Sequence, residues 1–168
     1  TGCGQMTSPG SQVVASIVND AGNLVRGGMA DVARLRTLAP LPDTAAEVCA
    51  VARDLGVTGD HVLLSDAATE TRLRALNSEA GALRRYRVLH FATHGLVSGE
   101  LKGLAEPALV LTPPEEASPT DDGLLTASEV AELKLEAEWV ILSACNTAAG
   151  AGPHYGGDEA LSGLARSF

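Results

Sequence analysis

The 168-residue sequence predicts an α/β fold, with a mostly parallel central sheet and helices on both faces. Apolar, strand-like runs alternate along the chain with amphipathic segments, and several of these segments begin with N-capping residues. Hydrophobic residues make up 45% of the chain, which is enough for one core, whereas the length is short for two domains. We therefore expect one domain whose parallel strands are joined by right-handed crossovers.

The N-terminal third is expected to hold one strand and one helix. Residues 12–20 (QVVASIVND) form a β-branched run that ends in Asn-Asp, which is typical of a strand. Residues 21–42 show some helical periodicity, but we interpret them mainly as a connecting loop. Thr44 and Glu47 have capping-box spacing, and apolar residues then recur at helical intervals up to Gly56, the expected C′ residue.

The middle of the chain predicts two further strands with a helix between them. Residues 61–66 (HVLLSD) resemble a second strand. Thr69 is expected to cap a helix whose Leu73 and Leu76 face the core. Residues 87–95 (RVLHFATHG) form the third expected strand, which is closed by a glycine that tolerates almost any turn geometry.

The segments 107–113 (PALVLTP) and 122–127 (DGLLTA) predict a hairpin around the acidic loop 113–122. We interpret the loop as a solvated flap; the functional alternative is that it steers a basic substrate segment towards a cleft. Ten of the 21 acidic residues lie between residues 98 and 138, where Lys102 and Lys134 are the only basic residues. Nearly all of the net charge of −9 therefore belongs to this part of the chain.

The last elements are a helix, a strand and a loop. Thr126 and Glu129 again have capping-box spacing and predict a helix through about Leu135. Residues 138–147 (EWVILSACNT) are nearly continuous in apolar residues at their centre, as in a strand buried on both faces. A glycine-rich loop over residues 148–158 follows, and a helical pattern then begins.

Composition excludes several classes of protein. The net charge of −9 argues against nucleic-acid binding, which depends on Lys and Arg side chains. The cysteines Cys3, Cys49 and Cys145 lack the CxxC spacing of zinc sites and are too scattered for a disulfide framework, so we expect a reducing compartment. No segment approaches the length of a membrane span, and the first residues carry no secretory pattern. The expected location is therefore the cytoplasm.

Two reactive side chains follow predicted strands at the point where each strand ends. His94 precedes Gly95 at the end of the third strand, and Cys145 stands where a Val/Ile/Leu run gives way to Asn-Thr and glycines. Ligands and chemistry in open α/β sheets lie at the carboxyl ends of the strands. A thiolate is the nucleophilic form of cysteine, and a nearby imidazole assists both its formation and the protonation of a leaving amine. The pair predicts cysteine-nucleophile chemistry.

With its surroundings, this pattern resembles the CHAT domain, a mostly bacterial branch of the caspase-like, separase-related cysteine peptidases. The resemblance covers about residues 40–168, and "FATHG" together with "LSAC" at this spacing is its most specific part. The resembling segments are, in order, LPDTAAEVCAVARDLG, ATETRLRAL, VLHFATHG, DGLLTASEVAELKLEAEWVILSACNTAAGAG and GGDEALSGLARSF.

The resemblance implies a caspase-like three-layer sandwich and a cysteine endopeptidase that needs no metal or organic cofactor. It implies His94 as general acid and base, Cys145 as nucleophile, and the backbone N–H groups of Gly95 and Cys145 as oxyanion donors. Residues 40–168 would be the peptidase core and residues 1–39 an N-terminal strand with its connection. The family also implies a C-terminal half that completes the pocket for the substrate side chain, and helical-repeat or regulatory domains as partners beside the protein substrate.

Other singled-out residues keep simpler interpretations. Asp158, after the nucleophile, is as compatible with lining a substrate pocket as with capping a helix. His90 is expected to lie deeper on the strand than His94 and to make structural hydrogen bonds. Cys49 is expected to be a small buried hydrophobe, and His61 a surface residue like His154.

Two other functions are alternatives to a peptidase. A caspase-like module that binds partners through an unassembled His–Cys pair is the main one. A nucleotide-binding domain is disfavoured because neither a Walker A nor a GxGxxG sequence follows any predicted strand.

Overall fold

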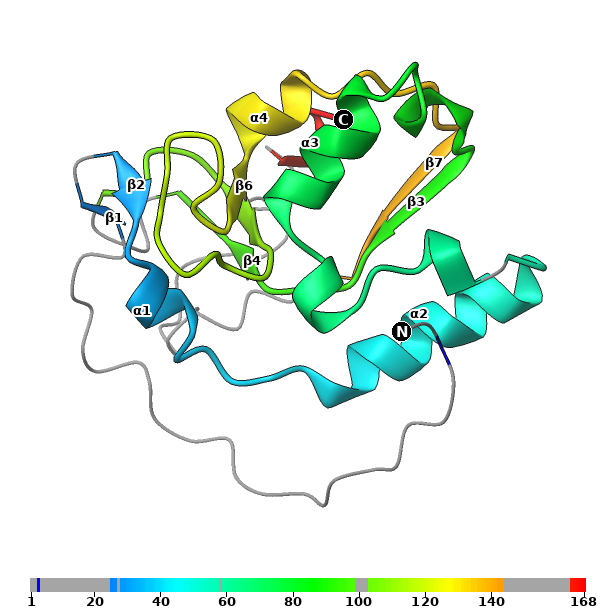
Figure 1. Ribbon diagram of the computed structural model, residues 1–168, viewed down its shortest axis with the longest axis horizontal. Coiled ribbons are helices and arrows are strands. Elements are labelled where there is room, and N and C mark those ends of the chain that lie inside the picture. The colour runs from blue at the N-terminus through cyan, green and yellow to red at the C-terminus, as the bar shows by residue number, and fades with distance from the viewer. Residues whose placement is uncertain (1–2, 4–24, 27, 58, 99–102, 144–163) are drawn as a thin grey trace, which may run out of the picture.

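A computed structural model gives the arrangement of the chain (Figure 1). The predicted strand at 12–20, the nucleophile candidate Cys145 and the loop 148–158 with His154 and Asp158 lie outside the residues that it describes. The described residues are 3, 25–26, 28–57, 59–98, 103–143 and 164–168.

The fold is mixed α/β, with two small sheets of opposite kinds. Strand β3 (Val88–Phe91) pairs in parallel with β7 (Trp139–Leu142), so that two segments 51 residues apart run side by side. Strands β4 (Gly95–Leu96), β5 (Ala108–Val110) and β6 (Leu124–Thr126) form an antiparallel sheet in that order. The predicted third strand, the hairpin and the last strand are confirmed.

The connecting segment after the N-terminal region contains more structure than the sequence predicted. Strands β1 (Val25–Arg26) and β2 (Met29–Ala30) pair as a two-stranded hairpin, and Gly28 between them adopts a φ of +88°. Helix α1 (Val32–Leu35) follows, with Asp31 as its side-chain N-cap. These elements are two to four residues long, which is too short for a periodicity to appear in the sequence.

Helix α2 (Pro42–Asp54) confirms the first predicted helix but not its capping box. The helix starts at Pro42, a residue suited to a first turn because it has no N–H to leave unpaired and its φ is already helical. Thr44 therefore lies inside the first turn, where its hydroxyl donates to the carbonyl of Leu41 (2.7 Å). Gly56, at φ +68°, follows the C-cap residue as predicted.

The two other predicted helices form with the predicted caps. In α3 (Glu70–Ser78) the Thr69 hydroxyl accepts the N–H of Arg72 (3.1 Å), and Leu73 is buried. In α4 (Ala127–Ala131) Thr126 and Glu129 make both bonds of a capping box. This helix ends four residues before Leu135, the predicted end.

The strand predicted at 61–66 is wrong. Two single 3-10 turns, Gly59–His61 and Ser65–Ala67, enclose the apolar residues between them. Val62 is buried against Cys49 and Ala52 of α2, so the apolar run is explained by packing on a helix. A short apolar run does not by itself distinguish a strand from a buried connection.

Helices α2 and α3 lie on opposite sides of the parallel pair (Figure 1). Leu89 and Phe91 of β3 and Leu142 of β7 pack in the cluster that contains Leu73 of α3. The alternate residue His90 faces the other way, towards Glu47 of α2. Side chains of a strand point alternately to its two faces, so α3 packs on one face of the pair and α2 contacts the other face at His90.

The prediction that the last strand is buried on both faces is wrong. Trp139 is 67% exposed and Ile141 is 38% exposed, whereas Val140 and Leu142 on the other face are partly buried. Strand β5, by contrast, is buried at every residue. Leu109 belongs to the cluster with Leu73, and its neighbours Ala108 and Val110 belong to a second cluster with Leu35 and Leu96.

Cys49 is not the free buried thiol that the sequence predicted, because it forms a disulfide with Cys3 (Cα–Cα 5.6 Å). Cys49 is 7% exposed and packs in the small cluster beneath α2, so it is both buried and cross-linked. Disulfides persist mainly in oxidising surroundings, and this one does not favour the expected reducing compartment. The cytoplasmic location stays a prediction. No helix within the described ranges is long and apolar enough to cross a membrane.

Candidate active site

His94 lies at the junction between the two sheets, three residues after β3 and directly before β4. Its carbonyl accepts the N–H of Val110 (2.9 Å), which fixes its backbone to β5. Its partly buried ring places Nε2 at 2.7 Å from the carbonyl oxygen of Ala39. A carbonyl can only accept a hydrogen bond, so Nε2 carries the proton, and in the neutral ring the basic lone pair is on Nδ1.

The backbone next to His94 is oriented by the antiparallel ladder. Gly95 lies opposite Leu109, and the hydrogen-bonded residues His94 and Val110 form the neighbouring pair. Hydrogen-bonded and non-hydrogen-bonded pairs alternate along such a ladder, so the N–H of Gly95 points away from β5. The side-chain hydroxyl of Thr93 also donates to the carbonyl of Val110 and fastens this corner.

The parallel register brings the carboxyl ends of β3 and β7 to the same edge. Phe91 lies opposite Leu142, and the N–H of Ser143 donates to the carbonyl of Phe91 (2.8 Å). In the sequence, His94 comes three residues after Phe91, and Cys145 comes three residues after Leu142. The two predicted catalytic residues therefore follow equivalent positions of adjacent parallel strands.

His90 makes the structural hydrogen bonds predicted for it. Its Nε2 lies 2.8 Å from the hydroxyl oxygen of Ser143 and 3.3 Å from Oε1 of Glu47. The Ser143 hydroxyl donates to the same carboxylate oxygen (2.6 Å). His61 also behaves as predicted, since it is exposed and its Nδ1 lies 3.0 Å from the hydroxyl of Tyr86.

The sequence reasoning missed three members of this site. Ala39 acts through its backbone carbonyl, which no side-chain pattern can reveal. Glu47 was assigned to a helix cap, although its carboxylate lies between α2 and β7. Ser143 belongs to the quoted "LSAC" segment, and its position directly after the strand was the one available signal.

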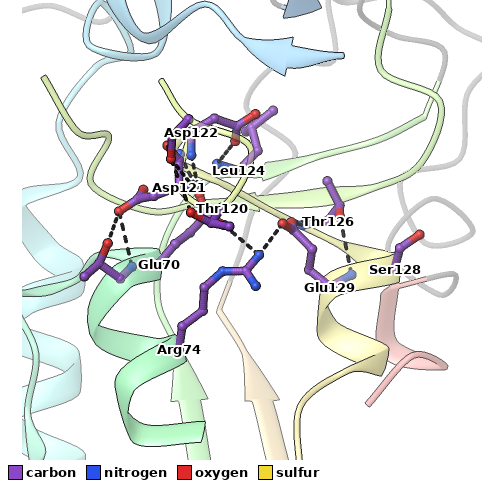
Figure 2. A network of polar contacts seen from close by, with 12 residues as sticks. Glu70, Arg74, Thr120, Asp121, Asp122, Leu124, Thr126, Ser128 and Glu129 are labelled. Carbon is purple, nitrogen blue, oxygen red and sulfur yellow. Dashed lines mark hydrogen bonds and ion pairs between the residues drawn. The ribbon is translucent and has the colours of Figure 1, made fainter. Parts of the chain in front are cut away.

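A second polar network lies between α3, the turn before β6 and α4 (Figure 2). Glu70 is 1% exposed, and its Oε2 accepts the backbone N–H groups of Asp122 (2.8 Å) and Gly123 (2.7 Å). Arg74 donates to Oε1 of Glu129 (2.6 Å), as Figure 2 shows. Burial raises the pKa of Glu70 to about 7, against the lowering effect of the two backbone bonds.

This second network holds loops together and does not resemble a catalytic site. The Asp122 carboxylate accepts from the backbone N–H groups of Ala30 (2.7 Å) and Leu124 (2.9 Å). The Asp121 carboxylate accepts from the Thr71 hydroxyl. The two aspartates of the predicted solvated flap are thus bound to the protein, whereas Glu115 and Glu116 are exposed as expected. In the part of the chain that the structure describes, no group of three or more His, Cys, Asp and Glu residues could hold a metal ion.

Comparison with known families identifies the family of this chain. The model of the CHAT domain matches residues 6–168, nearly the whole sequence. This chain belongs to the CHAT family. The family is caspase-like and contains caspase-like peptidases, so the resemblance stated above is confirmed. The comparisons with curated proteins and with solved structures returned no match.

Proposed function

We propose that this CHAT domain is a cysteine endopeptidase that cleaves a protein substrate with Cys145 as nucleophile and His94 as general acid and base. The observation that carries the proposal is the parallel pairing of β3 with β7. It aligns the strand ends from which His94 and Cys145 follow at the same three-residue offset. The bond from His94 Nε2 to the carbonyl of Ala39 supports the role of the imidazole. It orients the ring and leaves the basic lone pair of the neutral ring on Nδ1.

The reaction would proceed by acyl transfer. His94 Nδ1 takes the proton of the Cys145 thiol. The resulting thiolate attacks the peptide carbonyl carbon, a C–S bond forms, and the carbonyl electron pair moves onto oxygen. The N–H of Gly95, which points away from β5, and that of Cys145 would stabilise this oxyanion. Collapse breaks the C–N bond, and His94 gives its proton to the leaving amine. His94 then takes a proton from water, which attacks the thioester and releases the acid and the thiol.

We also propose the finer fold that the family implies, a three-layer sandwich with helices on both faces of a mostly parallel sheet. The positions of α2 and α3 on opposite faces of the β3–β7 pair support this extension. Asp158 as a substrate-binding residue stays a prediction, because it lies outside the described residues.

A peptide-based electrophile tests the function directly. We expect a mixed library of peptidyl electrophiles to modify Cys145, as identified by mass spectrometry of the protein. His94→Ala should slow this modification and peptide cleavage by about 10²-fold or more, because general acid–base assistance contributes that much. Melting temperature should change little, since the His94 ring is only partly buried.

His61→Ala is the matched control, because it removes a histidine that lies on the surface and is hydrogen-bonded to Tyr86. It should leave both rates unchanged. Modification of Cys145 at the wild-type rate in His94→Ala would contradict the dyad and favour the non-catalytic interaction module.

A further inference from the structure

Three elements meet at one buried histidine. Glu47 comes from α2, His90 from the middle of β3, and Ser143 from the position directly after β7. The His90 side chain is 9% exposed, and that of Glu47 is 44% exposed. We call these three residues the polar clamp. They join a helix and both strands of the parallel pair through side chains alone.

The contacts of the polar clamp define where its protons lie. The Ser143 hydroxyl has one proton, which it donates to Oε1 of Glu47 (2.6 Å). Its oxygen lies 2.8 Å from His90 Nε2 and must therefore accept a proton from that nitrogen. The result is a directed chain from His90 through Ser143 to Glu47. The other ring nitrogen, Nδ1, is buried and has no hydrogen-bond partner among the described residues.

A hydrogen-bond chain of this kind contributes little to stability. Burying the polar ring of His90 costs desolvation, and replacing buried polar groups by apolar side chains of similar volume is often neutral or stabilising. What such a network adds is a single defined geometry. Strand β7 is apolar, yet Ser143, the residue after it, is polar. Its side chain is bonded to His90 and its N–H to the carbonyl of Phe91.

We propose that the polar clamp positions the backbone that leads into Cys145, with Glu47, His90 and Ser143 as positioning residues for the reaction proposed above. Ser143 is two residues before Cys145 in the sequence. It is held from both sides, by β3 through its N–H and by α2 through its hydroxyl. The inference rests on the proposed peptidase function, but it assigns a role to residues that never touch the substrate.

Paired substitutions separate positioning from packing. Ser143→Ala removes the link, and Ser143→Thr keeps a hydroxyl at the same place. Glu47→Ala removes the acceptor, and Glu47→Gln keeps an oxygen that can accept the Ser143 proton. We expect the two alanine variants to lower kcat by about 10- to 100-fold with KM within about twofold, because small misplacements of reacting groups cost rates of this order. The two conservative variants should restore kcat to within about threefold.

A second measurement does not depend on peptidase activity. With Cys3 and Cys49 in a disulfide, Cys145 is the one remaining thiol of the three in the chain. Its alkylation by iodoacetamide under non-reducing conditions can therefore be followed by mass alone. We expect Ser143→Ala and Glu47→Ala to change this rate at least threefold, and Ser143→Thr and Glu47→Gln to leave it near that of the wild type.

The two measurements distinguish failure of the clamp from failure of the proposed function. If the wild-type protein cleaves no peptide but the alanine variants still change the alkylation of Cys145, the peptidase is wrong and the polar clamp stands. If the alanine variants lower only the melting temperature, with kcat and alkylation unchanged, the polar clamp is merely structural and the inference is overturned. Loss of kcat in the conservative variants to the same degree as in the alanine variants would overturn it as well.

Discussion

The antiparallel sheet and the parallel pair differ in how much protein surrounds them. Every residue of β5 is buried, and the neighbouring turn is fastened to the buried carboxylate of Glu70. Strand β7 presents Trp139 and Ile141 to the surface, and its carboxyl end is held by the polar clamp. We call the antiparallel sheet of β4, β5 and β6 the scaffold, because it is well buried. We call the carboxyl ends of β3 and β7 the working edge, because they are partly exposed and functional residues are commonly positioned on loops by a rigid scaffold.

His94 belongs to both regions. Its backbone is bonded to Val110 of the scaffold, while its ring reaches the carbonyl of Ala39 in the segment between α1 and α2. A side chain whose backbone is held by a sheet and whose ring is held by a loop has a defined position, as the role proposed for His94 requires.

The largest effect is expected at the disulfide that links Cys3 to Cys49 of α2, the helix that contacts the parallel pair through the polar clamp. In the chain-entropy description, a cross-link closing a loop of this size stabilises by about 4 kcal/mol. Reduction should therefore lower the free energy of unfolding by about that amount, measured by urea titration with and without a phosphine reductant. The Cys3→Ala/Cys49→Ala variant should be insensitive to the reductant. Three reactive thiols in the unfolded, non-reduced chain would contradict the disulfide.

The next effect concerns pH and the scaffold. The folded-state pKa of Glu70 is raised to about 7 from 4.5, chiefly by burial, so the folded chain binds a proton that the unfolded chain releases between these values. The contribution of protonated Glu70 to the free energy of unfolding is fully present below about pH 4.5 and is lost as the pH rises through 7. At 1.36 kcal/mol per unit, the loss is about 3 kcal/mol between pH 4.5 and pH 8.

Glu70→Gln is the matched variant, because its amide oxygen can still accept the N–H groups of Asp122 and Gly123. Urea midpoints at pH 5 and pH 8 should differ clearly for the wild type and much less for Glu70→Gln. An equal difference in both proteins would show that the pH dependence of stability comes from another group and not from Glu70.

The loss of stability on replacing a glycine by alanine should differ between the scaffold and a solvent-exposed turn. Gly123 and Gly28 have nearly the same φ, +87° and +88°, so an alanine is strained by about 1–2 kcal/mol at either position. At Gly123 the new Cβ would also lie 2.7 Å from Cβ of Pro113, whereas nothing lies within 4 Å at Gly28. We expect Gly123→Ala to lower the free energy of unfolding by about 2 kcal/mol more than Gly28→Ala, as overpacking does. Equal losses in thermal denaturation would show that Pro113 moves aside freely.

The sequence predicted the elements whose signals are local. The Thr69 cap, the Thr126 and Glu129 capping box and Gly56 each act within one turn of the chain, and each was confirmed. Thr44 failed because a nearby proline starts the helix earlier. The strand at 61–66 failed because its burial comes from contact with α2, which the sequence does not show.

The candidate site was predictable where it depends on residue type and not where it depends on distant partners. The position of His94 after β3 and the hydrogen-bonding role of His90 followed from one strand and its closing glycine. The partners Ala39, Glu47 and Ser143 lie 55, 43 and 53 residues from the histidines they contact. The aspartates of the acidic loop were assigned to solvent for the same reason, because their partners Ala30 and Thr71 are equally remote.

The smallest effect is expected from the two exposed acids of that loop. Arg36 donates to the carbonyl of Pro114 (2.7 Å), and Ala39, which contacts His94, is three residues further along the chain. Glu115 and Glu116 follow Pro114 directly, so their charges belong to a loop that is bonded to the segment leading to Ala39, and we expect their field to attract a basic substrate. Asp121 and Asp122 are left unchanged here, because neutralising them would break the bonds that hold the scaffold.

We expect Glu115→Gln/Glu116→Gln to lower kcat/KM for peptides rich in Lys and Arg by about two- to threefold at low salt, with neutral peptides unaffected. The difference should disappear near 1 M salt, where the screening length is about 3 Å. Glu132→Gln/Glu136→Gln removes the same charge from exposed positions after α4 and should have a weaker effect. A loss that is equal at low and high salt, or equal for the two double variants, would mean that the loop contributes no local steering and that the working edge selects its substrate by contact alone.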